Sequence, residues 1–170
     1  MAWSTAGARR AFAGAITAAA LAVIAGGPAG ATGRGQARAL DALYERSLES
    51  TQDLTTAVGA AVAQLNAGGD AQSLDCLETL RDAASETTGQ LLDVRDVADL
   101  SATLMAKADR RLGTAAVHRA ASRALAVLPA EAAQVSQTAQ LCAGQAAVQA
   151  KANSELQLIG ETTSALGRIR

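Results

Sequence analysis

Apolar residues, with an occasional threonine, recur at alternating spacings of four and three along most of the chain. Over residues 36–66 this spacing is followed by Tyr44, Leu48, Thr51, Thr55, Val58, Val62 and Leu65, and beside them lie Leu40, Leu43, Leu54 and Ala61. Such spacing places side chains on one face of an α-helix, in the heptad pattern of helices that pack against one another. The pattern therefore predicts one long helix, which ends at the glycine pair Gly68-Gly69.

The same spacing predicts three more long helices. The second begins near Ser73, and its apolar face is made by Leu77, Leu80, Ala84, Thr87, Leu91, Val94 and Ala98. The third extends from Thr114 to about Cys142, and Pro129 should kink or split it because proline lacks a backbone donor. The fourth follows Gly144, and its apolar face is made by Val148, Ala152, Leu156, Ile159, Thr163 and Leu166.

Residues 100–112 carry a shorter apolar stripe, which predicts a short helix that crosses one end of the others. Four helices of similar length with short connections are typical of an up-down-up-down four-helix bundle. We therefore expect an all-α fold in which residues 32–170 form a single domain, with helix contacts like those of a coiled coil.

The first 31 residues differ from the rest and are typical of a secretory signal peptide. Arg9 and Arg10 precede an apolar run over residues 11–25, which is too short and too rich in alanine to span a membrane firmly. The small residues Ala29-Gly30-Ala31 match a cleavage site, so we expect cleavage after Ala31, with a weaker site ending at Ala37. The chain should then reach the periplasm or be secreted, without a transmembrane span; an uncleaved anchor is the alternative.

Within this segment, Arg9-Arg10-Ala11-Phe12 resembles the R-R-x-F core of a twin-arginine export signal. Ala8 stands where that signal usually has Ser or Thr, and Ala13-Gly14 replaces the usual Leu-Lys. The resemblance implies export of a chain that is already folded, often with a cofactor inside. Two arginines are also ordinary in signals for general secretion, so both routes stay open.

Charge is distributed unevenly along the chain, whose net charge is −1. Residues 41–99 carry twelve acids and three arginines, a net charge of −9, whereas residues 100–170 carry eight basic residues and four acids, a net charge of +4. The two halves should attract each other within one bundle. After the signal peptide, Tyr44 is the only aromatic residue, so the chain lacks the aromatic platforms on which single-stranded nucleic acid stacks. We expect no nucleic-acid binding.

The two cysteines, Cys76 and Cys142, should form a disulfide, because an even cysteine count is typical of exported proteins. Cys76 lies near the start of the second predicted helix and Cys142 at the end of the third. In an up-down-up-down arrangement both positions lie at the same end of the bundle. Two free thiols or a thiolate metal site are the alternatives, but neither cysteine belongs to a C-x-x-C pair.

Candidate groups for catalysis or cofactor binding are few. Met105 and His118 could ligate a haem, but there is no C-x-x-C-H motif for covalent attachment and no aromatic residue to pack on the ring. Asp93, Asp96 and Asp99 recur on one helix face, for which a solvated surface is the alternative to a cation site. The motifs of serine hydrolases, zinc proteases, phosphate-binding loops and di-iron bundles are absent after the signal peptide. We expect no catalytic site and no bound cofactor or metal.

The most distinctive candidate surface is a basic segment made by Lys107, Arg110, Arg111, Arg119 and Arg123. Arg119 and Arg123 are four residues apart and share one helix face. The segment could dock an anionic partner, such as lipid headgroups or an acidic protein, or it could pair internally with Asp93, Asp96, Asp99 and Asp109. We expect an exported, non-catalytic bundle that acts through contacts with a protein or an envelope component. A bundle that binds a small ligand, a metal or haem is the alternative.

Overall fold

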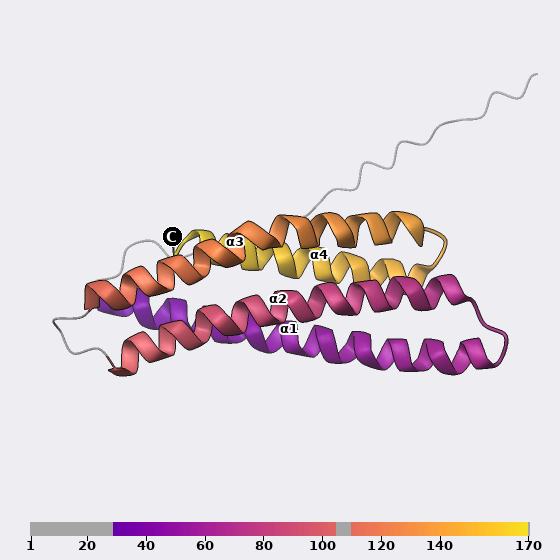
Figure 1. Ribbon diagram of the computed structural model, residues 1–170, viewed down its shortest axis with the longest axis horizontal. Helices are drawn as coiled ribbons and strands as arrows, with labels where there is room; N and C mark the ends of the chain where they lie inside the picture. Colours follow the sequence, from indigo (N-terminus) through magenta and orange to yellow (C-terminus); the bar gives the residue numbers. More distant parts are fainter. Residues whose placement is uncertain (1–28, 105–109, 170) are drawn as a thin grey trace, which may run out of the picture.

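The computed structural model describes residues 29–104 and 110–169, with side chains over residues 35–102 and 112–169. These residues form four α-helices and no strand: α1 (Ala29–Asn66), α2 (Ala71–Leu104), α3 (Arg110–Leu141) and α4 (Ala146–Gly167). Figure 1 shows the four helices along the long axis of an elongated molecule. This architecture confirms the predicted all-α helical bundle.

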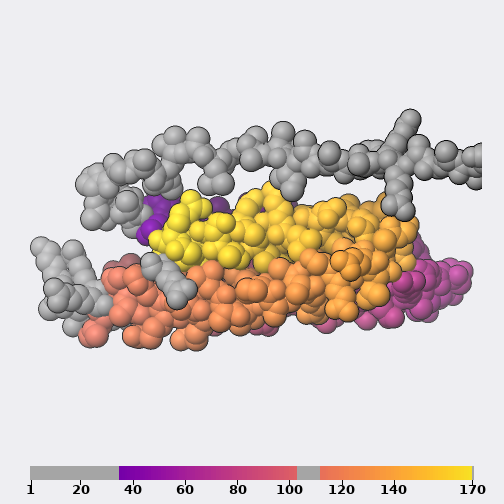
Figure 2. Space-filling view, turned by 90° about the horizontal axis from the view of Figure 1, so that it is seen from above, coloured from indigo at the N-terminus to yellow at the C-terminus, as the bar shows by residue number. Residues whose placement is uncertain are grey.

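Two turns lie against each other at one end of the bundle. Gln145, between α3 and α4, donates a hydrogen bond of 2.6 Å from Nε2 to Oδ2 of Asp70, between α1 and α2. Gln72 of α2 donates a hydrogen bond of 2.8 Å from Nε2 to the carbonyl oxygen of Leu141 in α3. These contacts join the α1–α2 pair to the α3–α4 pair at the right-hand end of Figure 1. The space-filling view of Figure 2 shows α4 packed along α3.

The glycine pair that was predicted to end the first helix does so in the structure. Gly68 has a φ of 90°, a conformation that residues with a Cβ atom rarely adopt. A Cβ atom on Gly69 would lie 2.7 Å from the carbonyl oxygen of Gln64, closer than two such atoms can approach. Asp70 then caps α2, because its carboxylate accepts hydrogen bonds of 3.0 and 3.2 Å from two backbone N–H groups of the first turn.

The core consists of aliphatic side chains and alanines along one face of each helix. On α2 the buried face agrees with the prediction and includes Leu77, Leu80, Ala84, Thr87, Leu91 and Val94. On α1 the prediction is half right: Leu54 and Val58 are buried, but Val62 and Leu65 are 41% and 37% exposed. The α1–α2 turn projects beyond the α3–α4 turn in Figure 1, so α3 and α4 do not cover this end of α1.

The separate crossing helix predicted over residues 100–112 is wrong. Residues 100–104 continue α2 and residues 110–112 begin α3, while residues 105–109 lie outside the described range. No proline or glycine stands between residues 90 and 104 to end α2. Gly113 is buried inside α3, and its carbonyl oxygen accepts a hydrogen bond of 3.3 Å from Ser101 of α2. A residue without a side chain lets the two helices approach at this point.

Helix α3 continues through Pro129 as one helix, so the predicted split does not occur. Pro129 removes one backbone donor from the helix. Pro129 lies at an exposed position of the helix.

Candidate functional site

Polar side chains replace the apolar core at one level of the bundle, and every helix contributes to this level. The residues, which we call the polar layer, are Ser47, Ser50 and Thr51 of α1, Thr87 and Thr88 of α2, Glu131 of α3 and Glu155 of α4. Glu155 is fully buried and Glu131 is only 5% exposed. Burying a carboxyl group is costly unless it is paired, so these two glutamates are the most unusual residues in the core.

On the α1–α2 side of the polar layer, hydroxyl groups form hydrogen bonds with one another. The hydroxyl oxygen of Thr88 lies 2.8 Å from that of Ser47 and 3.0 Å from that of Thr51. Thr88 and Thr51 are also within donating distance of the carbonyl oxygens of Ala84 and Ser47, at 2.8 and 3.0 Å. These side chains therefore bond both to their own helix and to the neighbouring one, which fixes α1 against α2.

The two glutamates complete the polar layer on its other sides. In each of them, only one of the two carboxyl oxygens has a hydrogen-bond partner. Oε2 of Glu131 lies 2.8 Å from the hydroxyl of Thr87, which connects α3 to α2. Oε2 of Glu155 accepts a hydrogen bond of 2.7 Å from Ser50, which connects α4 to α1. The Oε1 atoms of both glutamates are buried and have no hydrogen-bond partner among the described residues. Polar atoms in this condition are rare in folded proteins and point to a bound species or a held proton.

The environment of both carboxyl groups favours their neutral form. Burial raises the pKa of both Glu131 and Glu155 and is the largest cause of each shift. The hydrogen bonds from Thr87 and Ser50 oppose this by lowering the two pKa values. The negative charge of Glu131 raises the pKa of Glu155 further. The negative charge of Glu86 on α2 likewise raises the pKa of Glu131. The two groups therefore belong to one coupled site.

A groove of about 220 Å³ lies between α1 and α4, and Ser50 of the polar layer is one of the residues that line it. Its charged lining residues are Arg46, Glu49, Asp53 and Lys151, and Ser50, Leu54, Ser154, Gln157 and Leu158 complete it. Arg46 is held by an ion pair of 2.5 Å with Glu161 of α4. Because Ser50 both lines the groove and donates to Glu155, the groove connects solvent to the polar layer.

The residues of the predicted basic segment are described only in part. His118, Arg119 and Arg123 are exposed on α3, where they border an open hollow with Ser122 and Ala126. Arg119 and Arg123 form no ion pair with any described side chain. Lys107 lies outside the described residues, as do the side chains of Arg110 and Arg111.

The predicted haem pair cannot be placed as a pair, since Met105 also lies outside the described residues and His118 is exposed. Asp93 and Asp96 are exposed on α2. Within the described ranges, no three His, Cys, Asp or Glu side chains are grouped so that they could hold a metal ion.

Cys76 and Cys142 form a disulfide in the structure, with Cα atoms 6.7 Å apart. Both residues are buried. The bond joins the second turn of α2 to the turn that follows α3, beside the contact between Asp70 and Gln145.

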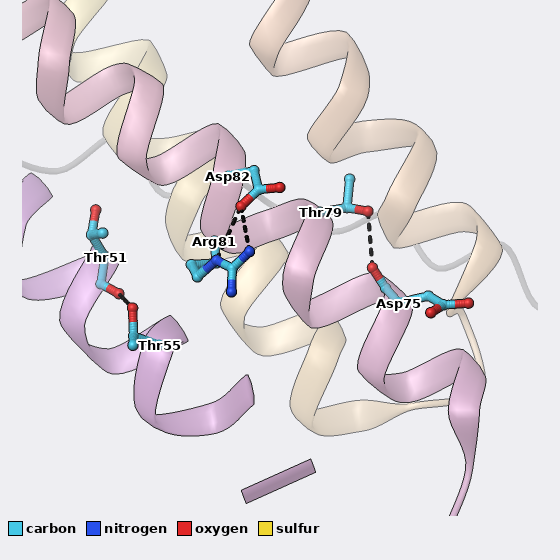
Figure 3. A network of polar contacts seen from close by, with 6 residues as sticks. All are labelled: Thr51, Thr55, Asp75, Thr79, Arg81 and Asp82. Atoms are coloured by element: carbon cyan, nitrogen blue, oxygen red, sulfur yellow. Dashed lines mark hydrogen bonds and ion pairs between the residues drawn. The ribbon is translucent and has the colours of Figure 1, made fainter. Parts of the chain in front are cut away.

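Although Arg46 and Glu161 pair across α1 and α4, most polar contacts on the exposed surface stay within one helix. Figure 3 shows three of them: Thr55 donates to the carbonyl oxygen of Thr51, Thr79 donates to that of Asp75, and Arg81 forms an ion pair of 2.7 Å with Asp82. An exception is Arg95 of α2, which pairs with Asp41 of α1 over 2.9 Å and lies 4.8 Å from the ring centroid of Tyr44. Exposed pairs of this kind contribute little and build no site.

Arg9, Arg10 and Phe12 of the predicted export signal lie outside the described residues, whereas its predicted cleavage site, Ala29-Gly30-Ala31, forms the start of α1. None of the four described helices combines the length and apolar content needed to cross a lipid bilayer. Comparison with protein-family models, with curated proteins and with solved structures gave no match.

Proposed function

We propose that the chain is exported as an up-down-up-down four-helix bundle and acts, without catalysis, by binding an anionic protein or envelope component. The binding surface would be the basic face of α3, which we define by His118, Arg119 and Arg123. Arg110 and Arg111 precede these residues on the same helix, and Lys107 precedes them in the sequence.

The observation that carries this proposal is the placement of the acids in residues 100–170. Glu131 and Glu155 are buried, and Glu161 is paired with Arg46. The fourth acid, Asp109, lies outside the described residues. Arg119 and Arg123 are exposed and are not paired with any described side chain, so their charges are available to an anionic partner.

The proposal of export rests on the sequence of the first 31 residues. It is compatible with the disulfide between Cys76 and Cys142, because disulfides persist in oxidising compartments. N-terminal sequencing of the exported protein tests it and should find Thr32 as the first residue. Replacing Arg9 and Arg10 together by lysine should abolish export only if the twin-arginine route is used. Detection of Met1 or Ala2 on the exported protein would refute the signal peptide.

The binding proposal is tested by reversing charge on α3. Protein starting at Thr32 should bind vesicles that contain phosphatidylglycerol, or should cross-link to an envelope protein through a photoreactive residue at position 122. The double variant Arg119→Glu/Arg123→Glu should lose that interaction. The variant Lys151→Glu/Arg168→Glu changes the net charge equally on α4 and should retain it. Equal loss in both variants would show a response to net charge alone and would contradict a site on α3.

A further inference from the structure

The two buried glutamates of the polar layer have a chemistry that the proposed function does not use. Their unpartnered Oε1 atoms lie in the core, and no ion pair joins either carboxyl group to a described cation. A pair of ionised carboxylates in that position would be strongly unfavourable. We propose that Glu131 and Glu155 form a buried proton-binding site, in which the pair holds at least one proton at neutral pH and releases it as the bundle opens.

The hydroxyl of Thr87 supports a proton on Glu131. Its oxygen lies 3.1 Å from the carbonyl oxygen of Ala83 and 2.8 Å from Oε2 of Glu131, but a hydroxyl carries only one hydrogen. An ionised Glu131 and the Ala83 carbonyl would compete for that hydrogen. A protonated Glu131 can instead donate to Thr87 while Thr87 donates to Ala83, so that both short distances become hydrogen bonds.

The charged groups around the pair do not offer a replacement for the proton. On α2, Glu86 is acidic and acts against ionisation of Glu131. On α1, Glu49 and Asp53 line the groove above Ser50, and the cation beside them, Arg46, is engaged by Glu161 of α4. Lys151 of α4 lines the same groove and makes no ion pair with Glu155. The site is therefore surrounded by more negative than positive charge, which favours proton binding.

The groove between α1 and α4 supplies the route for the proton. Ser50 is the link, because it lines the groove and its hydroxyl contacts Glu155. On release, the carboxylic O–H bond breaks, the proton passes to a water molecule in the groove and the negative charge stays on the carboxylate. Solvation of that charge requires water, so release is coupled to separation of α1 from α4.

The direct test is infrared spectroscopy of the disulfide-bonded chain starting at Thr32, labelled with 13C at the glutamate side-chain carboxyl. At pH 7 the wild type should show the carbonyl stretching band of a protonated carboxylic acid. The band should be absent in Glu131→Gln/Glu155→Gln, whose amides cannot titrate. Glu45→Gln, at an exposed position of α1 outside the groove, is the matched control and should retain it. Absence of the band from the wild type at pH 7, or its persistence in the double variant, would overturn the proposal.

A second measurement separates proton binding from simple packing. Urea unfolding of the wild type should show a folding equilibrium constant that falls with rising pH, by up to about tenfold per pH unit for each proton released on unfolding. The fall should begin near the ordinary glutamate pKa of about 4.3, where the unfolded chain ionises. The double glutamine variant should show a flatter profile, whereas Glu45→Gln, outside the groove, should follow the wild type. Parallel profiles in the wild type and the double variant would also refute the site, because they would leave the pair with no part in proton release.

Discussion

Ser50 of α1 donates a hydrogen bond of 2.7 Å to the buried carboxyl group of Glu155 on α4, across the groove that separates the two helices. The residues are 105 positions apart in the sequence, and this contact links the first helix to the last. Oε2 of Glu155 thus has a hydrogen-bond partner, whereas Oε1 is buried without one. The stability of the bundle should therefore depend on Ser50 more than its small side chain suggests.

Replacing Ser50 by alanine should lower the free energy of unfolding by about 1–3 kcal/mol, because both oxygens of Glu155 would then be buried without a partner. Since the lost hydrogen bond lowers the pKa of Glu155, that pKa should rise further in the variant. Urea denaturation at pH 7 measures the effect. Ser154→Ala, on the other wall of the groove, is exposed and should change stability by less than about 0.5 kcal/mol. A similar loss in both variants would contradict a specific role for Ser50.

Two adjacent leucines of α2 should respond very differently to truncation. Leu91 is fully buried, so Leu91→Ala should cost about 2–5 kcal/mol through lost burial and a residual cavity. Leu92 is 36% exposed, and Leu92→Ala should cost much less. Thermal or urea unfolding of the two variants measures the difference. Equal effects would mean that α2 is rotated from the orientation described.

Reduction of the disulfide should lower stability without removing helix. The bond closes a loop with a sequence separation of 66 residues, which in the chain-entropy model corresponds to about 4 kcal/mol. Far-ultraviolet circular dichroism should be unchanged below the melting temperature, while the melting temperature itself falls. Cys76→Ala/Cys142→Ala should behave like the reduced protein. Two free thiols in the exported protein would refute the pairing in its natural compartment.

The cap of α2 should give a pH effect of the opposite sign to that of the buried glutamates. Hydrogen bonds, first from the side chain of Ser73 and then from the backbone of Gln72, lower the pKa of Asp70. Its stabilising effect is therefore present above the ordinary aspartate pKa and is lost as pH falls through the lowered value. Hydrogen exchange at the Gln72 and Ser73 amides should accelerate in Asp70→Ala at pH 6. The difference from the wild type should disappear in strong acid; a difference that persists there would contradict a cap based on the carboxylate.

The end of α1 and the α2 core could be predicted from the sequence because they depend on local signals. Gly68-Gly69 ends a helix by its backbone preference, and the heptad of α2 is filled with aliphatic residues. The exposure of Val62 and Leu65 could not be predicted, since it depends on where α4 begins. The continuation of α2 past residue 100 was missed because a weak apolar stripe was taken for a new element.

The polar layer was missed because apolar residues were preferred at each step of the heptad. On α4 the strict spacing of four and three is followed by the buried residues Val148, Ala152, Glu155, Ile159, Thr162 and Leu166. The predicted face substituted Leu156 for Glu155 and Thr163 for Thr162, although both chosen residues are only partly buried. On α3 the same spacing passes through Leu128, Glu131 and Val135. A glutamate at a strict core position is thus a signal that the sequence does contain.

The disulfide makes a covalent ring of residues 76–142, which contains nearly all of α2 and α3. These two helices are tethered at both ends, by the sulfur bridge and by the peptide chain that connects them. Helices α1 and α4 stand outside the ring, and the peptide chain joins each of them to it at the end near the bridge. Their other ends have no covalent link to the ring within the described residues and are held by contacts such as the Arg95–Asp41 and Arg46–Glu161 ion pairs. Because Ser50 and Glu155 close the seam between α1 and α4, separation of these two helices is the opening that the ring does not restrict, and it would expose the buried carboxyl group of Glu155 to water.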